Sequence, residues 1–228
     1  MGKFLIFYIL YRLTGNPIIA LLVILSVYLL VDRAYLGFLP DPFRVFKNSS
    51  RIRELKKLVS INPHDSRSLK ELGMYLVEKK DYQNAMRFLQ KAEEKMSDDP
   101  EFNYYYGLST ARTGNIIRGR QFFEKAVNAS PTLKYGEPYL MMAEVYMDNA
   151  EYESALSLLE KFEKIHSSSS RGLYRMGLVK LKLGSRDEAI EYLKKSIQAF
   201  KASPFFKRKT DRKWAWKSRM ALIMMGGR

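Results

Sequence analysis

Residues 103–131 read NYYYGLSTARTGNIIRGRQFFEKAVNASP, and this stretch decides the fold. Apolar residues recur at helical spacing on both sides of Thr113-Gly114-Asn115, which predicts two short helices joined by a tight turn. Gly107 is small enough to let the second helix lie close against the first. Phe123 gives the second helix an apolar inner face, and Pro131 ends it. The stretch therefore predicts an α-helical hairpin.

The same hairpin recurs along the chain in nearly constant register. Gly73 lies 34 residues before Gly107, and Ala143 lies 36 residues after it. Gly177 follows after another 34 residues. Each of these small residues comes directly after a large apolar one, and in the second helix of each unit an Ala or Gly lies four positions ahead of a Leu or Phe. A hairpin of this kind cannot bury its apolar face alone, so the units are expected to stack into a solenoid.

These units resemble the tetratricopeptide repeat, whose pattern joins W-x2-L-G-x2-Y to A-x3-F and a terminal proline. The resemblance implies an all-α solenoid over residues 63–204, with units that start near residues 66, 100, 136 and 170. The unit at residues 103–131 departs from the pattern, because the first Trp and the later Ala are missing. The chain as a whole resembles bacterial inner-membrane proteins in which one N-terminal transmembrane helix precedes such repeats.

The charge of the chain is concentrated at its two ends. The 228 residues carry 39 Lys and Arg against 24 Asp and Glu, a formal net charge of +15. Residues 1–63 carry nine cations against three acids, and residues 205–228 carry eight against one. The repeats between them are nearly neutral. An anionic partner is therefore expected to meet the ends of the chain.

Residues 17–38 are expected to form a transmembrane anchor. Residues 17–31 carry no charge, and a helix extended to residue 38 covers about 33 Å, enough for a hydrocarbon core of roughly 30 Å. Residues 1–16 form a shorter apolar segment that either lies in the membrane interface or packs on the anchor as a hairpin. More Lys and Arg follow the anchor than precede it, which predicts that the repeats face the cytoplasm. The resemblance implies that the membrane is the bacterial inner membrane. A cleaved signal peptide is the alternative, but no A-x-A-like site follows.

The segments that flank the repeats are basic. Residues 39–62 are expected to form a linker and a half-repeat helix, with Leu55 and Leu58 on its inner side. Residues 205–228 are expected to form a basic, aromatic capping helix and tail. The same composition suits an anionic lipid surface or RNA. The residues expected at the membrane surface are Arg44, Lys47, Arg51, Arg53, Lys56, Lys57, Lys207, Arg208, Lys209, Trp214 and Trp216.

The sequence contains no catalytic pattern. It has no cysteine and two histidines, His64 and His166, about which no carboxylate lies at metal-ligand spacing. It also lacks a phosphate-binding glycine loop and a G-x-S-x-G nucleophile motif. We therefore expect neither an enzyme nor a cofactor or metal.

A protein-binding role is what the resemblance implies, because the first helix of each tetratricopeptide unit lines a groove that takes peptides or helices. The chain is then expected to be a membrane-anchored adaptor or assembly factor. Its partner is a peptide or helix bound in the groove and belongs to a membrane complex. The alternative is an RNA- or ribosome-docking factor that acts through the basic tail. Some groove positions are also expected to pack between repeats. The expected groove residues are Lys70, Met74, Tyr104, Tyr105, Leu108, Arg112, Leu140, Met141, Met147, Arg171, Tyr174, Arg175 and Leu178.

Overall fold

The computed structural model describes residues 2–31 and 42–226, with side chains for residues 6–28 and 48–226. The chain divides into two compact units, one up to residue 46 and one from residue 47 onward, and each is described by itself. All regular structure in the described ranges is helical. The predicted all-α fold is therefore confirmed.

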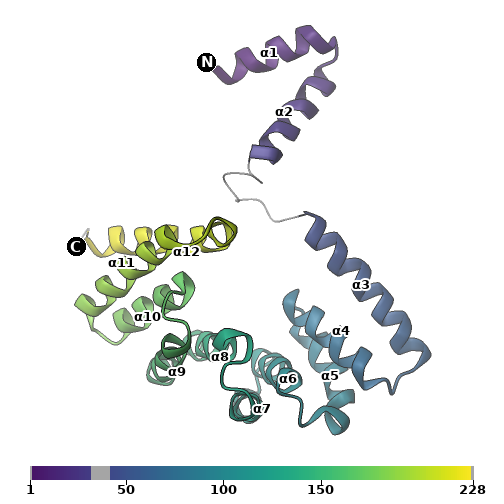
Figure 1. Cartoon of the computed structure of the whole chain (residues 1–228), viewed down its shortest axis with the longest axis vertical. Coiled ribbons are helices and arrows are strands. Elements are labelled where there is room, and N and C mark those ends of the chain that lie inside the picture. The colour runs from purple at the N-terminus through teal and green to yellow at the C-terminus, as the bar shows by residue number, and fades with distance from the viewer. Residues whose placement is uncertain (1, 32–41, 227–228) are drawn as a thin grey trace. The chain divides into compact units, whose positions relative to one another are not determined.

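The N-terminal unit contains a hairpin of two apolar helices, α1 (Gly2–Thr14) and α2 (Pro17–Val31) (Figure 1). Its turn is fixed by short hydrogen bonds. Thr14 Oγ1 donates to the carbonyl of Leu10 at 2.8 Å, and Asn16 Oδ1 accepts from the amide of Ile18 at 2.8 Å. In the structure α1 packs against α2, and the placement of α1 at a membrane stays a prediction.

Both helices of this hairpin are short. None of the helices in the described ranges has the length and apolarity needed to cross a membrane. The predicted anchor at residues 17–38 is helical as far as Val31, and its remaining residues lie outside the described part of the chain.

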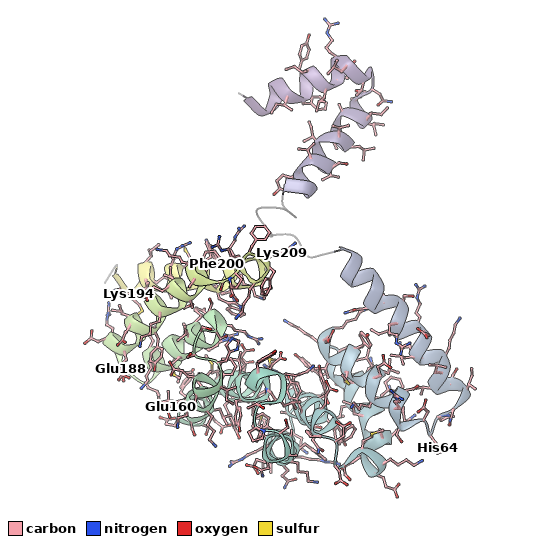
Figure 2. All side chains as sticks on the ribbon, in the orientation of Figure 1. His64, Glu160, Glu188, Lys194, Phe200 and Lys209 are labelled. Carbon is pink, nitrogen blue, oxygen red and sulfur yellow. The ribbon has the colours of Figure 1, made fainter. Side chains whose placement is uncertain are left out.

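The second unit is a stack of helix pairs. The four pairs are α4 (Ser66–Glu78) with α5 (Tyr82–Met96), α6 (Pro100–Arg112) with α7 (Ile116–Ala129), α8 (Glu137–Asp148) with α9 (Tyr152–Ile165), and α10 (Ser170–Lys182) with α11 (Arg186–Ala202). α3 (Pro42–Ile61) precedes them, and His64 lies in the connection to α4 (Figure 2). α12 (Phe205–Gly226) follows them. The predicted helical-repeat solenoid is confirmed.

Local sequence signals explain where these helices begin. Asp99 accepts from the amides of Glu101 and Phe102 at 2.9 and 3.0 Å, and Asn115 accepts from that of Arg118 at 3.0 Å. Such side chains satisfy amide groups that have no partner within the helix. Equivalent capping residues start α4, α5 and α10. Three of the four helix pairs therefore carry side-chain caps, whereas α8 and α9 begin without one.

Glycine sets the distance between the helices of the second pair. A Cβ added to Gly107 would lie 2.8 Å from the carbonyl oxygen of Gly119 and 3.0 Å from the amide nitrogen of Phe123. Backbone atoms cannot move aside as a flexible side chain can. The close approach that the sequence predicts at Gly107 is therefore present, and the partner position is also a glycine.

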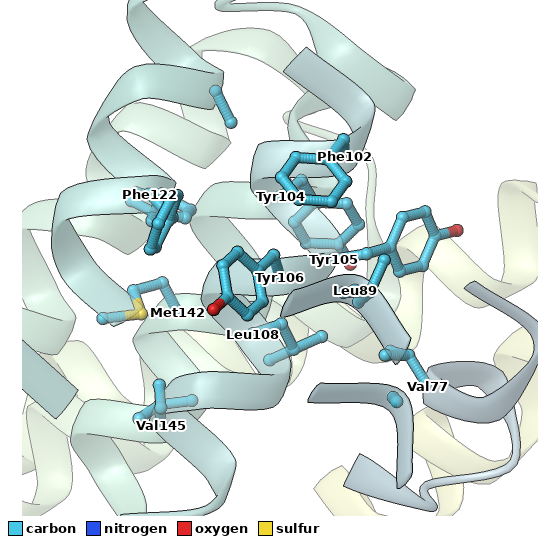
Figure 3. Close-up of a cluster of buried hydrophobic side chains, with 14 of the residues drawn as sticks. Val77, Leu89, Phe102, Tyr104, Tyr105, Tyr106, Leu108, Phe122, Met142 and Val145 are labelled. Atoms are coloured by element: carbon cyan, nitrogen blue, oxygen red, sulfur yellow. The ribbon is translucent and has the colours of Figure 1, made fainter. Parts of the chain in front are cut away.

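One apolar core runs through the array from α3 to α10. Phe102 and Tyr106 are among its largest fully buried side chains, and their rings lie 5.5 Å apart (Figure 3). The ring of Tyr106 also packs on Phe122 at 4.5 Å. The core is thus continuous across the repeat boundaries, as stacked repeats require.

The half-repeat helix α3 closes the first end of the core. Leu55 is completely buried, as predicted, together with Ile52 and Val59. Leu58 was also predicted to face inward but is 41% exposed. The inward stripe of α3 follows residues 52, 55 and 59, and Leu58 falls beside it. That prediction was wrong because a lone helix of a repeat has no partner helix to cover a second stripe.

At the other end, α12 caps the array. Trp214 is buried against Tyr174, with 5.6 Å between the ring centroids. Ser218 Oγ lies 2.9 Å from Ser196 Oγ, and Asp211 accepts from Ser203 Oγ at 2.7 Å. α12 therefore covers the apolar end of the last pair through both apolar and polar contacts.

The connection between the second and third units, which is two residues longer than the others expected from the repeat spacing, contains a short 3₁₀ turn, η2 (Leu133–Gly136). Lys134, Tyr135 and Gly136 have φ angles of 47°, 56° and 78°, all in the left-handed region. Only glycine adopts this region without strain. The insertion is therefore accommodated by a locally strained backbone, and the helices on either side remain regular.

Candidate functional site

The inner helices, defined here as α4, α6, α8 and α10, present one continuous face of the array. α6 and α8 lie on the inner side of the curve, with α7 and α9 outside them (Figure 1). Most of the predicted groove residues lie on these four helices, and the structure divides them into buried and accessible groups.

Five predicted groove residues are buried. Tyr104, Tyr105 and Leu108 are between 3% and 4% exposed, and Leu140 and Tyr174 are similarly covered. The rings of Tyr104 and Tyr105 pack on each other at 4.8 Å, and Lys134 Nζ lies 5.3 Å from the centre of the Tyr105 ring. Burial raises the pKa of Tyr104 well above its usual value. Tyr104, Tyr105, Leu108 and Leu140 belong to the core, which corrects the prediction that they line an open groove, whereas Tyr174 packs on Trp214 and also lines the hollow between α10 and α12.

The correction has a simple physical reason. The sequence places these side chains at inner-face positions, but an aromatic ring is long enough to turn toward the next repeat and pack there. The rings gain more by leaving water than by lining an unoccupied surface. The accessible members of the predicted set are the partly buried residues Lys70, Met74, Arg112, Met141, Met147, Arg171, Arg175 and Leu178.

Ion pairs join each inner helix to the next. Arg51 of α3 holds Glu71 of α4 through two hydrogen bonds of 2.9 and 2.7 Å. Lys70 of α4 reaches Asp99 at the start of α6, with 2.5 Å between Nζ and Oδ2. Arg112 of α6 pairs with Asp148 of α8. None of these pairs was anticipated, because partners on neighbouring repeats lie about thirty residues apart and only the fold brings them together.

The junction between α8 and α10 carries the most buried ion pair. Glu144 of α8 is 7% exposed and accepts from two guanidinium groups of α10, Arg171 at 2.7 and 3.0 Å and Arg175 at 2.7 Å. Burial alone would raise the pKa of this carboxyl, but the two arginines outweigh it and hold the pKa of Glu144 below its usual value. The junction between the third and fourth repeats is therefore fixed by a paired, charged group.

Two apolar hollows open between neighbouring helices. The α4–α6 groove, of about 520 Å³, is lined by Met74, Tyr75 and Met96 together with six charged side chains, namely Arg67, Lys70, Glu71, Glu78, Asp99 and Glu101. The α10–α12 groove, of about 680 Å³, is lined by Tyr174, Leu178, Leu181, Lys182, Arg186, Trp216, Lys217, Met220, Ala221, Met224 and Met225. Sequence reasoning missed the α12 side of the second groove. The signal available was the four-residue spacing of Trp216, Met220 and Met224, which places them on one helix face.

The predicted membrane-surface residues have several environments. Four of them are exposed, namely Arg53, Lys56, Lys57 and Lys209. Arg51 instead forms ion pairs with Glu54 and Glu71. The side chains of Arg44 and Lys47 lie outside the described part of the chain. In the C-terminal segment, Lys207 lies 3.2 Å from His166 and Arg208 donates to the carbonyl of Ser203 at 2.9 Å.

The two tryptophans of the C-terminal segment differ in their exposure to solvent. Trp216 is 57% exposed. Trp214 is buried where α12 packs on Tyr174 of α10, and it is not free to contact lipid or RNA. The expectation for Trp214 is therefore corrected, since an amphipathic helix that closes the array must turn one aromatic face inward. Among the residues that the structure describes, no three side chains of His, Asp or Glu converge as a metal site would require.

Comparison with known proteins agrees with this architecture. Residues 170–202, which make up α10 and α11, match the family model of the tetratricopeptide repeat. The array has the tetratricopeptide-repeat fold. Its solved neighbours include MamA, with a TM-score of 0.59 and 22% identity over 69% of this chain and 85% of that one. Another is YrrB, described as a TPR protein with an unusual peptide-binding site, with a TM-score of 0.55 and 16% identity over 75% of this chain and 85% of that one.

Curated relatives share part of the sequence. The chain is 25% identical over 154 residues to the BBSome complex member BBS4 homolog of Drosophila melanogaster, covering 62% of this chain and 31% of that protein. It is 27% identical over 130 residues to tetratricopeptide repeat protein 21B of Mus musculus, covering 57% of this chain and 10% of that protein. The chain thus spans at most 31% of the length of these two relatives.

Proposed function

We propose that this chain is a membrane-anchored adaptor that binds a segment of a partner protein along its inner helices. The observation that carries the proposal is the set of half-buried apolar side chains left between the inter-repeat ion pairs. Met74, Met141, Met147 and Leu178 remain accessible on α4, α8 and α10. Methionine side chains are flexible and polarisable, and they adapt to irregular apolar partners. YrrB, which has the same fold, is described as binding a peptide.

A scaffold role fits the rest of the array. The ion pairs and the continuous core hold the inner helices in fixed positions, so a partner would meet a preformed surface. Tetratricopeptide-repeat proteins are generally scaffolds rather than enzymes. The inner face therefore supports partner binding better than chemistry.

Crosslinking from defined positions tests this proposal. A photo-reactive amino acid at Met141 or Met147 of α8 is expected to trap a partner in cells, and the adduct is identified by mass spectrometry. Ser154 and Lys161, exposed on α9, serve as matched outer positions. Adducts from the outer positions alone would contradict binding along the inner helices.

The membrane part of the proposal rests on the N-terminal hairpin. Its large apolar side chains are exposed over both helices, with Leu13 at 77% and Ile18 at 68%. Arg12 is the one charged side chain described in this hairpin. A helix that is apolar on every side is usually buried in protein or lipid. We infer that lipid takes up this surface, at the bacterial inner membrane and with the repeats on the cytoplasmic side.

Fractionation tests the membrane part. The full chain should stay with membranes after alkaline carbonate washing, and deletion of residues 1–38 should release it. Protease added to spheroplasts should spare the repeats. Digestion of residues 64–204 from outside would overturn the cytoplasmic orientation, and release of the full chain by carbonate would overturn the anchor.

A further inference from the structure

The junction between α10 and α12 differs from the other junctions of the inner face. At each earlier junction, a cation of one helix meets a carboxylate of its neighbour, and at the α8–α10 junction that carboxylate, Glu144, lies on the earlier helix. α10 has no acidic residue, and the one acid of α12, Asp211, is buried and bound to Ser203. Across the described residues, no ion pair joins α10 to α12. The last junction therefore lacks the carboxylate that the pattern supplies elsewhere.

Cations gather where that carboxylate is missing. Lys213 Nζ and Lys217 Nζ lie 4.8 and 5.1 Å from the centre of the Trp214 ring, and the guanidinium carbons of Arg175 and Arg171 lie 5.3 and 5.5 Å from it. Glu144 balances the two arginines. Neither lysine forms an ion pair within the described part of the chain. Two positive charges thus lie beside one aromatic ring without an ion pair of their own, and Glu144 acts on Lys213 only at longer range.

The effect of this crowding is visible on Lys213. Burial lowers the pKa of its ammonium group, and the nearby charges of Arg171 and Lys217 lower it further. Lys80, at the end of α4, acts in the same direction. An anion placed near Lys213 would relieve this repulsion. The geometry and the charge balance both favour a negatively charged ligand at this point.

The α10–α12 groove adjoins these lysines and is apolar. Lys217 belongs to both sites, since it stacks on Trp214 and lines the groove. Three cations and eight apolar residues line the groove, and none of the described lining residues is acidic. Met224 is 71% exposed at its edge. A ligand that fits here needs an apolar side for the methionines and a negative side for the lysines.

We propose that the α10–α12 groove binds an acidic amphipathic helix of a partner protein. Lys213 and Lys217 are one helical turn apart, so glutamates four residues apart on the partner would meet both. The partner's leucine-type side chains would enter between Leu178 and Met220. This inference rests on the proposed adaptor function and specifies the chemistry of the partner segment.

A designed peptide tests the inference on the full chain in a non-ionic detergent. The probe is a short fluorescent amphipathic helix with leucines on one face and glutamates on its flanks, and its match has every glutamate replaced by glutamine. Fluorescence anisotropy should show the acidic peptide binding about tenfold more tightly, which is about 1.4 kcal/mol. Equal binding of the two peptides would overturn the acidic part of the inference.

Variants locate the site. Lys213→Gln with Lys217→Gln should weaken the acidic peptide at least tenfold. Lys194→Gln, at a position labelled in Figure 2, together with Lys201→Gln removes the same charge from exposed positions of α11 and should leave binding within twofold. Equal losses from the two pairs would show a non-specific charge effect and overturn the site. Because Lys213 and Lys217 also contact the cap, Met224→Glu at an exposed position provides a second variant, which should abolish binding without affecting the melting temperature.

Two other ligands complete the test. The protein partner would be overturned if a single-stranded RNA oligonucleotide or a soluble short-chain phosphatidylserine bound more tightly than the acidic peptide and lost binding equally in the Lys213 and Lys217 variant. If the peptide fails while Met141 and Met147 still crosslink a partner, this inference fails alone. If neither binds, the adaptor function fails with it.

Discussion

The α4–α6 groove and the α10–α12 groove have similar size and opposite charge. Four carboxylates and two cations line the first, and three cations with no carboxylate line the second among the described residues. In the first groove, Lys70 is already held by Asp99 and Glu101. Repeats of one fold thus offer partners two different surfaces, because the charge of each groove depends on which ion pairs its own helices complete.

The two grooves also differ in what closes the array beside them. At the first end, Arg51 of α3 pairs with Glu71 and apolar residues of α3 complete the core. At the other end, Trp214 is the largest buried side chain of α12 and packs on Tyr174 of α10. If this comparison is correct, the cap should depend on one side chain more strongly than any other part of the inner face does.

The largest effect is expected from Trp214→Ala. Removal of a buried aromatic side chain leaves a cavity under α12 and should cost about 3–5 kcal/mol of unfolding free energy. Trp216→Ala is the matched control, since that ring is 57% exposed, and it should change stability by less than about 0.5 kcal/mol. Chemical denaturation of both variants measures the difference. Similar losses at the two positions would mean that Trp214 does not close the array.

Glu144→Gln should give the next largest effect. The substitution leaves Arg171 and Arg175 without a negative partner, and because both are partly exposed we expect a loss of about 2–3 kcal/mol. Glu101→Gln in the α4–α6 groove is the counterpart, and its more exposed pairs with Lys70 and Lys134 should be worth less than about 1 kcal/mol. Equal effects would remove the distinction between the two ends.

A pH titration of stability tests the role of the Glu144 carboxylate. The folded-state pKa of Glu144 is below its usual value, so its ionised form stabilises the protein fully above the unfolded pKa of about 4.3. That contribution is lost as the pH falls through the lowered folded pKa. Below pH 5, stability should therefore fall less steeply in Glu144→Gln than in the native chain. An unchanged acid slope would show that the carboxylate is not the group that titrates.

The smallest effect is expected at η2, which lies between the two ends. Tyr135 is 80% exposed and has a φ of 56°, so Tyr135→Gly removes strain without removing a buried contact. Stability should rise by about 0.5–1 kcal/mol. Lys134→Gly relieves a similar φ but breaks the pair with Glu101, so its gain should be smaller. Thermal unfolding of the two variants gives the comparison, and a loss of stability in Tyr135→Gly would contradict the strain.

The fold was largely predictable because repetition is visible in the sequence. The spacing from Gly73 to Gly177 placed all four hairpins, and Gly107 makes the expected close contact with Gly119. The insertion appeared as a spacing of 36 instead of 34 residues. Its left-handed backbone gave no signal, because Lys134 and Tyr135 are not residues that favour this conformation.

The candidate site was predicted less well. The positions of Tyr105 and Tyr174 on the inner helices were correct, but their burial depends on neighbours more than thirty residues away, which no local pattern reveals. Composition also could not separate Trp214 from Trp216, since one faces the cap and the other faces solvent on the same helix. The pairing of Glu144 with two arginines depends likewise on the stacking of one repeat on the next.

That pairing makes the order of the repeats part of the structure. In arrays built from identical units, any unit can follow any other, so lengthening by duplication is simple. Here the helix that follows α8 must supply two arginines to Glu144. In the repeat register, α6 would bring Glu101 and Tyr105 to those places. Duplicating or exchanging the second unit at this junction would set one carboxylate against another, so the chain cannot be extended there by copying that unit.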